Sequence, residues 1–128
     1  TLLAHSTGKK AVLYVGAGVG GTLKRMASVM PKGALIVAIE ADGQGAPDYC
    51  NPTASLKETC RQLSVLGANV QLFIGDAKSA KVISAVESYA PYDFIFVNGD
   101  SDDFYNYAPM SYATGRVQGS NIEVVYRE

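Results

Sequence analysis

The stretch Ala11-Val-Leu-Tyr-Val-Gly-Ala-Gly-Val-Gly-Gly-Thr-Leu-Lys-Arg-Met26 decides the fold of this chain. An apolar run, Ala11 to Val15, stops at four closely spaced glycines, and helix-forming sequence starts at Thr22. This order predicts a strand, a tight glycine turn and a helix. Glycines let a ligand lie directly against the main chain, and the N–H groups that open a helix favour an anionic or polar ligand group. The alternative is a glycine-rich turn that binds nothing, but one glycine would suffice for that.

The composition is that of an ordinary globular protein of 128 residues, and we expect a single domain over residues 1–128. The net charge of −1 predicts no broad electrostatic attraction to nucleic acid. No apolar run approaches the ~18 residues of a membrane span, and no signal peptide is visible, so we expect a cytoplasmic location. Cys50 and Cys60 match no metal-ligand spacing and are interpreted as free thiols. The single histidine, His5, is interpreted as a solvated side chain.

The chain up to Val97 repeats the alternation of strand and helix. The predicted strands after the first are Ala34–Ile39, Val70–Ile74 and Asp93–Val97. The predicted helices are Thr22–Met30, Thr53–Leu66 and Lys78–Tyr89. Such alternation with short turns is typical of a parallel sheet with right-handed crossovers, and the apolar first strand suits its centre. We therefore predict an α/β fold with a Rossmann-like, doubly wound, mostly parallel sheet, helices on both faces and a shortened or incomplete C-terminal part.

Apolar residues at helical spacing predict which helix faces are buried. For the first helix they are Leu23, Met26, Ala27 and Met30. For the second they are Leu56, Cys60, Leu63 and either Leu66 or Gly67, with Thr53 or Ser55 as the cap. For the third they are Val82, Ile83 and Val86.

The segment after Asp100 does not repeat this pattern. We expect residues 101–119 to be loop, or a short helix with a loop, and Ile122–Tyr126 to join the sheet as an edge strand. Joins within Ala113–Gln118 look as if intervening sequence were missing. We therefore expect the chain to be part of a longer protein. Its other pieces would include a flexible lid near the site of an acceptor substrate, since such lids are often mobile until ligand binds.

Glycines or hydrogen-bonding side chains follow every predicted strand. They are Gly16–Gly21, Glu40, Asp76 with Ala77, and Asn98–Asp100. The carboxyl ends of parallel strands share one edge of a sheet, and ligands of open α/β sheets bind there. We therefore expect these residues to converge on one site.

Two acids at this edge suggest the class of ligand. Glu40 lies roughly 20 residues past the glycine loop, where an acid can accept hydrogen bonds from both ribose hydroxyls; the alternative is an acid that faces water. Asp76 is placed to accept a hydrogen bond from an adenine amino group, or to cap the following helix, and the two roles are compatible. Together they predict a ligand that contains adenosine.

These residues resemble a known family, the class I S-adenosylmethionine-dependent methyltransferases. The resemblance extends from Val12 to about Tyr107. It rests on Val15–Gly21, on Ile39-Glu40, on Gly75-Asp76-Ala77 and on the run Tyr92-Asp93-Phe94-Ile95-Phe96-Val97-Asn98-Gly99-Asp100. That run is similar to the matching run of the small O-methyltransferases of the catechol and caffeoyl-CoA type, and to that of the cephalosporin-hydroxylase-like group. Asp103-Phe104-Tyr105-Asn106-Tyr107 is similar to an Asn-Tyr-x-x-Tyr motif of the former group.

The resemblance implies S-adenosylmethionine as the cofactor, an oxygen of a small molecule as the methyl acceptor, and a role for each site residue. Residues of the loop under the methionine part would be Gly16, Ala17, Gly18 and Gly20. Glu40 would hold the ribose, and Asp76 and Ala77 would meet the adenine. Asn98 and Asp100 would face the methyl-transfer site.

Three positions depart from the family pattern. The family's acid two residues before the first glycine is Tyr14 here, and Ser101 stands where related sequences often have His or Lys. The family's catalytic metal-binding aspartate is Asn98, and a neutral amide is a poorer ligand for a hard divalent cation than a carboxylate. We therefore assign no metal ligands and regard the divalent metal as doubtful. Asp100 is the candidate general base, with a loop-capping acid as the alternative.

Two other functions fit parts of the sequence. Gly16–Gly21 also satisfies the G-x-G-x-x-G fingerprint of NAD-dependent oxidoreductases, although no Tyr-x-x-x-Lys pair supports hydride transfer. A non-catalytic relative that binds S-adenosylmethionine or another nucleotide is favoured by Asn98 and Tyr14. The expected partners are a small-molecule acceptor and, if the chain self-associates, a homo-oligomer; we expect no nucleic acid and no membrane.

Overall fold

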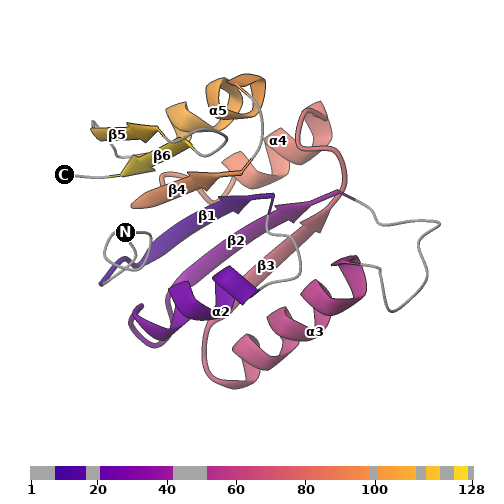
Figure 1. Cartoon of the computed structure of the whole chain (residues 1–128), viewed down its shortest axis with the longest axis vertical. Helices are drawn as coiled ribbons and strands as arrows, with labels where there is room; N and C mark the ends of the chain where they lie inside the picture. The colour runs from indigo at the N-terminus through magenta and orange to yellow at the C-terminus, as the bar shows by residue number, and fades with distance from the viewer. Residues whose placement is uncertain are drawn as a thin grey trace.

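A six-stranded sheet with the order β3-β2-β1-β4-β6-β5 carries the helices on its two faces (Figure 1). The computed structural model describes residues 8–16, 21–41, 52–98, 101–111, 115–118 and 123–126. The strands are β1 (Ala11–Val15), β2 (Leu35–Glu40), β3 (Asn69–Ile74), β4 (Phe94–Val97), β5 (Gly115–Gln118) and β6 (Glu123–Tyr126). The helices are α2 (Gly21–Ser28), α3 (Pro52–Val65), α4 (Ala80–Glu87) and α5 (Ser101–Tyr107), followed by the 3-10 helix η2 (Ala108–Met110).

The first strand lies at the centre of the parallel part of the sheet, as its apolar sequence predicts. β1 pairs in parallel with β2, where Ala11 lies opposite Leu35, and with β4, where Val12 lies opposite Phe94. β3 pairs in parallel with β2 on the far side. The predicted α/β, Rossmann-like and doubly wound fold is confirmed. Across the described ranges, no helix combines the length and the apolar character that a bilayer crossing requires.

Alternation along the strands divides the core into two layers. Val12 and Tyr14 face α2 and α3, whereas Leu13 and Val15 face α4 and α5. The helix side chains buried on the first face include Leu23, Met26, Leu56, Cys60 and Leu63, and those on the second include Val86, Phe104 and Tyr107. Each buried apolar side chain of this size contributes about 1.5–3 kcal/mol relative to an exposed one. The helix faces predicted from spacing are therefore correct, with one exception.

The exception is at the end of α3. Either Leu66 or Gly67 was predicted as the last inner-face residue; Leu66 is 76% exposed, whereas Gly67 is half-buried. Gly67 has a φ of +103° and its N–H donates to the Ser64 carbonyl, while the next N–H, of Ala68, reaches back to Leu63. This C-terminal turn redirects the chain directly after the helix, so Leu66 points outward.

The start of α3 also differs from its prediction. The helix begins at Pro52, a residue whose fixed φ and missing N–H suit the first helical position. Thr53 and Ser55 therefore lie inside the helix and neither is its cap.

The C-terminal segment is more regular than the sequence indicates. Residues 101–119 contain α5, η2 and the strand β5, whereas we predicted at most a short helix and a loop. β6 does join the sheet, but it pairs antiparallel with both β4 and β5, so β5 and not β6 is the edge. The error has a physical reason, because a strand of four residues gives too short a pattern to separate from loop.

Hydrogen bonds join the start of β4 to the start of β1 and to the end of η2. A carboxylate oxygen of Asp93 accepts the N–H groups of Lys10 and Ala11, at 3.0 and 3.3 Å. The N–H of Tyr92 donates to the carbonyl of Met110 at 2.9 Å. The chain therefore leaves β4 at the carboxyl edge, passes through α5 and η2, and returns to the amino edge of the sheet.

Candidate functional site

The carboxyl ends of the four parallel strands border a cleft of about 200 Å³. Its lining residues are Val15, Gly16, Ile39, Glu40, Ala41, Gly75, Asp76, Ala77, Lys78, Asn98 and Asp103. Five residues predicted for the site, one or two from each strand end, are thus brought together: Gly16, Glu40, Asp76, Ala77 and Asn98. The other predicted site residues, Ala17, Gly18, Gly20 and Asp100, lie outside the described residues, and the roles assigned to all of them stay predictions.

Backbone hydrogen bonds hold the strand ends at this edge. The N–H of Gly16 donates to the carbonyl of Ile39 at 2.8 Å, and the N–H of Asn98 donates to that of Val15 at 2.8 Å. The N–H of Gly75 donates to the carbonyl of Glu40 at 2.9 Å. The floor of the cleft is therefore fixed main chain, and rigid elements position binding groups more accurately than loops do.

The main chain directly after β4 leaves no room for a side chain at position 16, so this residue must be glycine. Its φ is +83°, and a Cβ atom built on it would overlap the carbonyl oxygen of Asn98. The side-chain Nδ2 of Asn98 lies 3.5 Å from the Gly16 carbonyl oxygen, the long end of the hydrogen-bond range. This glycine therefore serves the junction of β1 with β4, whether or not a ligand lies above it.

Glu40 ends β2 on the same face as Ile36 and Ala38, the face covered by α2 and α3. One carboxylate oxygen, Oε1, accepts the N–H of Ala41 at 2.9 Å. A carboxylate offers about four acceptor sites on two oxygens. Glu40 is half-buried and its carboxylate borders the cleft.

Asp76 shapes the turn between β3 and α4. Its Oδ1 accepts the N–H of Lys78 at 2.9 Å, and its carbonyl accepts the N–H of Ser79 at 2.9 Å. The capping residue of α4 is Ser79, which makes no side-chain capping bond. The prediction that Asp76 caps this helix is therefore wrong; the carboxylate stabilises the preceding turn, beside the cleft.

The sequence reasoning assigned no site role to the residues that α5 contributes here. Asp103 is 7% exposed, lines the cleft, and lies 3.5 Å from Nζ of Lys78. Tyr107, one helical turn later, donates its hydroxyl to the carbonyl of Ala77 at 2.7 Å. Burial, followed by the charges of Asp103 and Asp76, raises the pKa of Tyr107 to about 12. The signal that could have found them is their four-residue spacing, which places both on one helix face.

Tyr14 occupies the position where the family has an acid, and it is a core residue. Its ring packs edge-on against Phe96 with centroids 4.8 Å apart. Burial raises the pKa of its phenol, a side-chain hydrogen bond with Thr22 opposes that rise, and the charge of Glu40 adds to it. Tyr14 is therefore a neutral link between the end of β1 and the start of α2.

The cleft has an excess of negative charge. Among the residues that the structure describes, three carboxylates line it, Glu40, Asp76 and Asp103, together with the ammonium group of Lys78. Across the residues that the structure describes, no three His, Cys, Asp or Glu side chains are grouped so as to hold a metal ion. Asp100 is not among those residues, so the metal-free site stays a prediction.

The fold is that of solved S-adenosylmethionine-dependent methyltransferases. The chain is similar to a protein-L-isoaspartate O-methyltransferase, with 24% identity over 91% of this chain and 33% of that chain, and a TM-score of 0.62. It is similar to a methyltransferase from Geobacter sulfurreducens, with 14% identity over 98% and 74% of the two chains and a TM-score of 0.55. It is also similar to fibrillarin from Aeropyrum pernix, solved with natively bound S-adenosyl-L-methionine, with 10% identity over 94% and 67% and a TM-score of 0.56.

These similarities establish the fold alone, since the identities are low. The chain spans about a third of the length of the first of these proteins. No family model and no curated protein matches the sequence.

Proposed function

We propose that the cleft binds S-adenosylmethionine and that the chain takes part in methyl transfer to an oxygen of a small molecule. One observation carries this proposal: Gly16, Glu40, Asp76 and Asn98, each from a different strand end, line one cleft. This is the place where open α/β sheets bind their ligands. The similarity in fold to solved methyltransferases supports the same conclusion.

The charge of the cleft favours this cofactor over NAD. Both ligands contain adenosine, but S-adenosylmethionine carries a sulfonium and an ammonium group, whereas NAD carries a pyrophosphate. Within the described lining, three carboxylates and one cation, Lys78, attract the first ligand and repel the second. Two unit charges about 4 Å apart interact by roughly 1–4 kcal/mol between bulk water and a protein surface. The lining is therefore a physical reason to prefer a cationic ligand.

The chain's own residues would bind the cofactor, orient it toward the acceptor and deprotonate the acceptor hydroxyl. Bound S-adenosylmethionine supplies a methyl group on an already activated leaving group. Glu40 would accept hydrogen bonds from the ribose, and the fixed strand ends would hold the cofactor in line with the acceptor, since alignment supplies much of the acceleration in such a reaction. Asp100 remains the predicted general base for the proton of the acceptor hydroxyl, and Asn98 presents an uncharged amide at the cleft.

Calorimetric titration tests the binding half of this proposal. S-adenosylmethionine and S-adenosylhomocysteine should bind more tightly than NAD. Glu40→Ala should weaken S-adenosylhomocysteine at least tenfold, because a hydrogen bond to a charged acceptor contributes about 1.5–3 kcal/mol. Glu87→Gln, an exposed acid on α4, is the matched control and should change nothing. Tighter binding of NAD would refute the cofactor assignment, and unchanged affinity in Glu40→Ala would remove that residue from the site.

A methyl-transfer assay distinguishes an enzyme from a binding protein. Asn98, at the position of the family's catalytic aspartate, favours a non-catalytic relative as the second candidate function. Incubation of the full chain with methyl-labelled S-adenosylmethionine and small phenolic or aliphatic hydroxyl acceptors should yield the labelled methyl ether and S-adenosylhomocysteine. Tight cofactor binding without any transfer would support the non-catalytic function instead.

A further inference from the structure

A groove of about 610 Å³ lies between α2 and α3, apart from the cleft. Its lining comes from the second half of α2, the turn before β2 and the end of α3. These segments lead into the amino ends of β2 and β3, so the groove and the cleft lie at opposite edges of the sheet (Figure 1). The volume is within the roughly 300–1,000 Å³ typical of ligand sites. We call it the α2–α3 groove.

The middle of the α2–α3 groove is apolar. Leu63 is 7% exposed, and Ala27 and Met30 are partly buried against the same core. Leu66, which is 76% exposed, also lines the groove, and its chain neighbour Val65 is 74% exposed. Leu66 therefore adds a large exposed apolar side chain to the wall of the groove.

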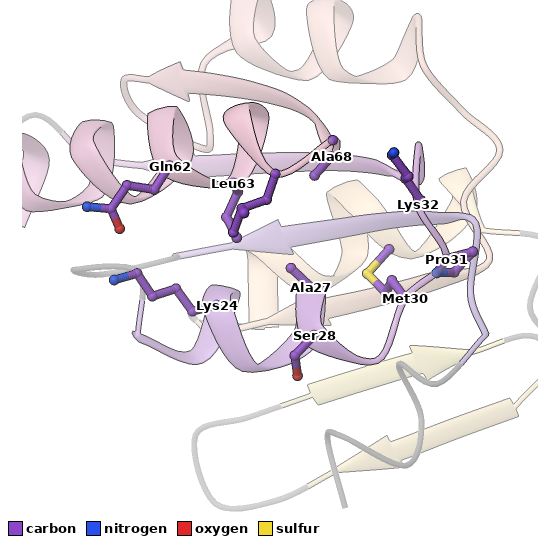
Figure 2. A pocket seen from close by; sticks show the side chains of 11 residues that line it. Lys24, Ala27, Ser28, Met30, Pro31, Lys32, Gln62, Leu63 and Ala68 are labelled. Carbon is purple, nitrogen blue, oxygen red and sulfur yellow. The ribbon is translucent and has the colours of Figure 1, made fainter.

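The two ends of the groove are basic. Figure 2 shows Lys24 and Gln62 together at one end, Ala27 and Leu63 in the middle, and Lys32 at the other end. Among the described residues, the lining contains no carboxylate. The charged residues of the described parts of α2, α3 and the turn before β2 are Lys24, Arg25, Lys32, Lys57, Glu58 and Arg61. The one acid, Glu58, is paired with Arg61 at 2.6 Å and also accepts a hydrogen bond from Gln62 at 3.2 Å. Five basic side chains against this one acid leave a local positive excess on a chain whose net charge is −1.

We propose that the α2–α3 groove docks a segment of a partner polypeptide that is apolar in its centre and acidic at both ends. An amphipathic helix laid in a groove between two helices is a common mode of peptide recognition. A cation at each end of an apolar floor complements acids at both ends of such a segment. An amphiphile with a single anionic head would match only one of the two lysines. Electrostatic complementarity of this kind sets specificity and association rate.

Labelled peptides test the proposal on the full chain. The probe is a peptide of about 15 residues with a leucine-rich centre, made with glutamate, glutamine or lysine flanks. Fluorescence anisotropy should show that the glutamate version binds more tightly than the lysine version. Non-specific attraction to a chain of net charge −1 would favour the lysine version instead. Amide NMR shifts should map the bound glutamate peptide to Ala27 and Gly67, which line the groove.

Charge-reversal variants locate the effect. Lys24→Glu combined with Lys32→Glu should weaken the glutamate peptide about tenfold or more, and Leu66→Ser should weaken all three versions, since that side chain is exposed and dispensable for the core. Lys81→Glu on α4 is the matched control and should leave binding unchanged. Three results would overturn the proposal: no preference for glutamate flanks, shifts that map elsewhere, or tight saturable binding of decanoate alone with none of any peptide. Circular dichroism of each variant confirms that the fold is retained.

Discussion

At the residue scale, Gly16 shows that a glycine predicted to bind a ligand can have a structural cause. Any other residue here would have to adopt a left-handed backbone conformation, and its Cβ atom would overlap the carbonyl oxygen of Asn98. The first costs about 1–3 kcal/mol, and forcing atoms into an occupied space costs about 1–3 kcal/mol more.

Gly16→Ala should therefore lower the free energy of unfolding by about 2–6 kcal/mol. Gly21→Ala is the control, because a Cβ at Gly21 meets no atom within 4 Å and the residue is helical. Urea denaturation of both variants measures the difference. Equal stabilities would show that the end of β4 can move away at little cost.

Asn98 leads to a second expectation at this scale. An amide in place of a carboxylate binds hard divalent cations weakly, so any methyl transfer by the chain should continue in the presence of a chelator. An assay with and without EDTA measures this. Activity that disappears with EDTA and returns with magnesium would show that other carboxylates, such as Asp102 or Asp103, complete a metal site.

At the scale of elements, α5 fastens the turn between β3 and α4 that borders the cleft. Tyr107 donates to the carbonyl of Ala77, and the carboxylate of Asp103 lies beside Lys78. Two side chains one helical turn apart thus hold two consecutive residues of the turn. Asp76 and Ala77, the predicted adenine contacts, are therefore positioned partly by α5, which begins about 25 residues later in the sequence.

Tyr107→Phe should cost about 1–3 kcal/mol, because the Ala77 carbonyl loses its buried donor. Tyr105→Phe is the control, since Tyr105 is 66% exposed. The neutral hydroxyl is favoured in the folded state, so its contribution is complete below pH 10 and is lost as the pH rises through about 12. Denaturation between pH 8 and about 12 should show a smaller alkaline loss in Tyr107→Phe than in the parent. An identical loss in both would assign the titration to other groups, such as Tyr92, whose pKa burial also raises.

At the scale of the whole molecule, the sequence predicts the structure correctly where an apolar pattern repeats over several residues. Four apolar runs separated by amphipathic helices predict the parallel sheet, its central strand and the edge where Glu40 and Asp76 meet. Local patterns cannot reveal that Asn98 leaves no room beside Gly16, or that α5 returns to Ala77, because both facts are contacts between residues far apart in the chain. The strand β5 was missed for the opposite reason, since four residues carry too little periodicity.

The same scale explains why the α2–α3 groove is invisible in the sequence. Leu66 continues the apolar spacing of α3 and is indistinguishable there from a buried residue. The turn at Gly67 places it outside the core. Whether Leu66 is buried or exposed depends on where the helix ends, and a periodic pattern defines that end point poorly.

The pairing of β1 with β4 also has a kinetic consequence. It brings together residues 82 positions apart, as at Gly16 and Asn98, whereas β1, β2 and β3 are joined by shorter crossovers. Closing the longest loop costs the most chain entropy, so we expect this junction to form late in folding and to open early in partial unfolding. A ligand across the cleft bridges both strands and binds only the closed form. At about 100 times its dissociation constant it should stabilise that form by about 2.7 kcal/mol, and hydrogen exchange at the β4 amides should slow accordingly.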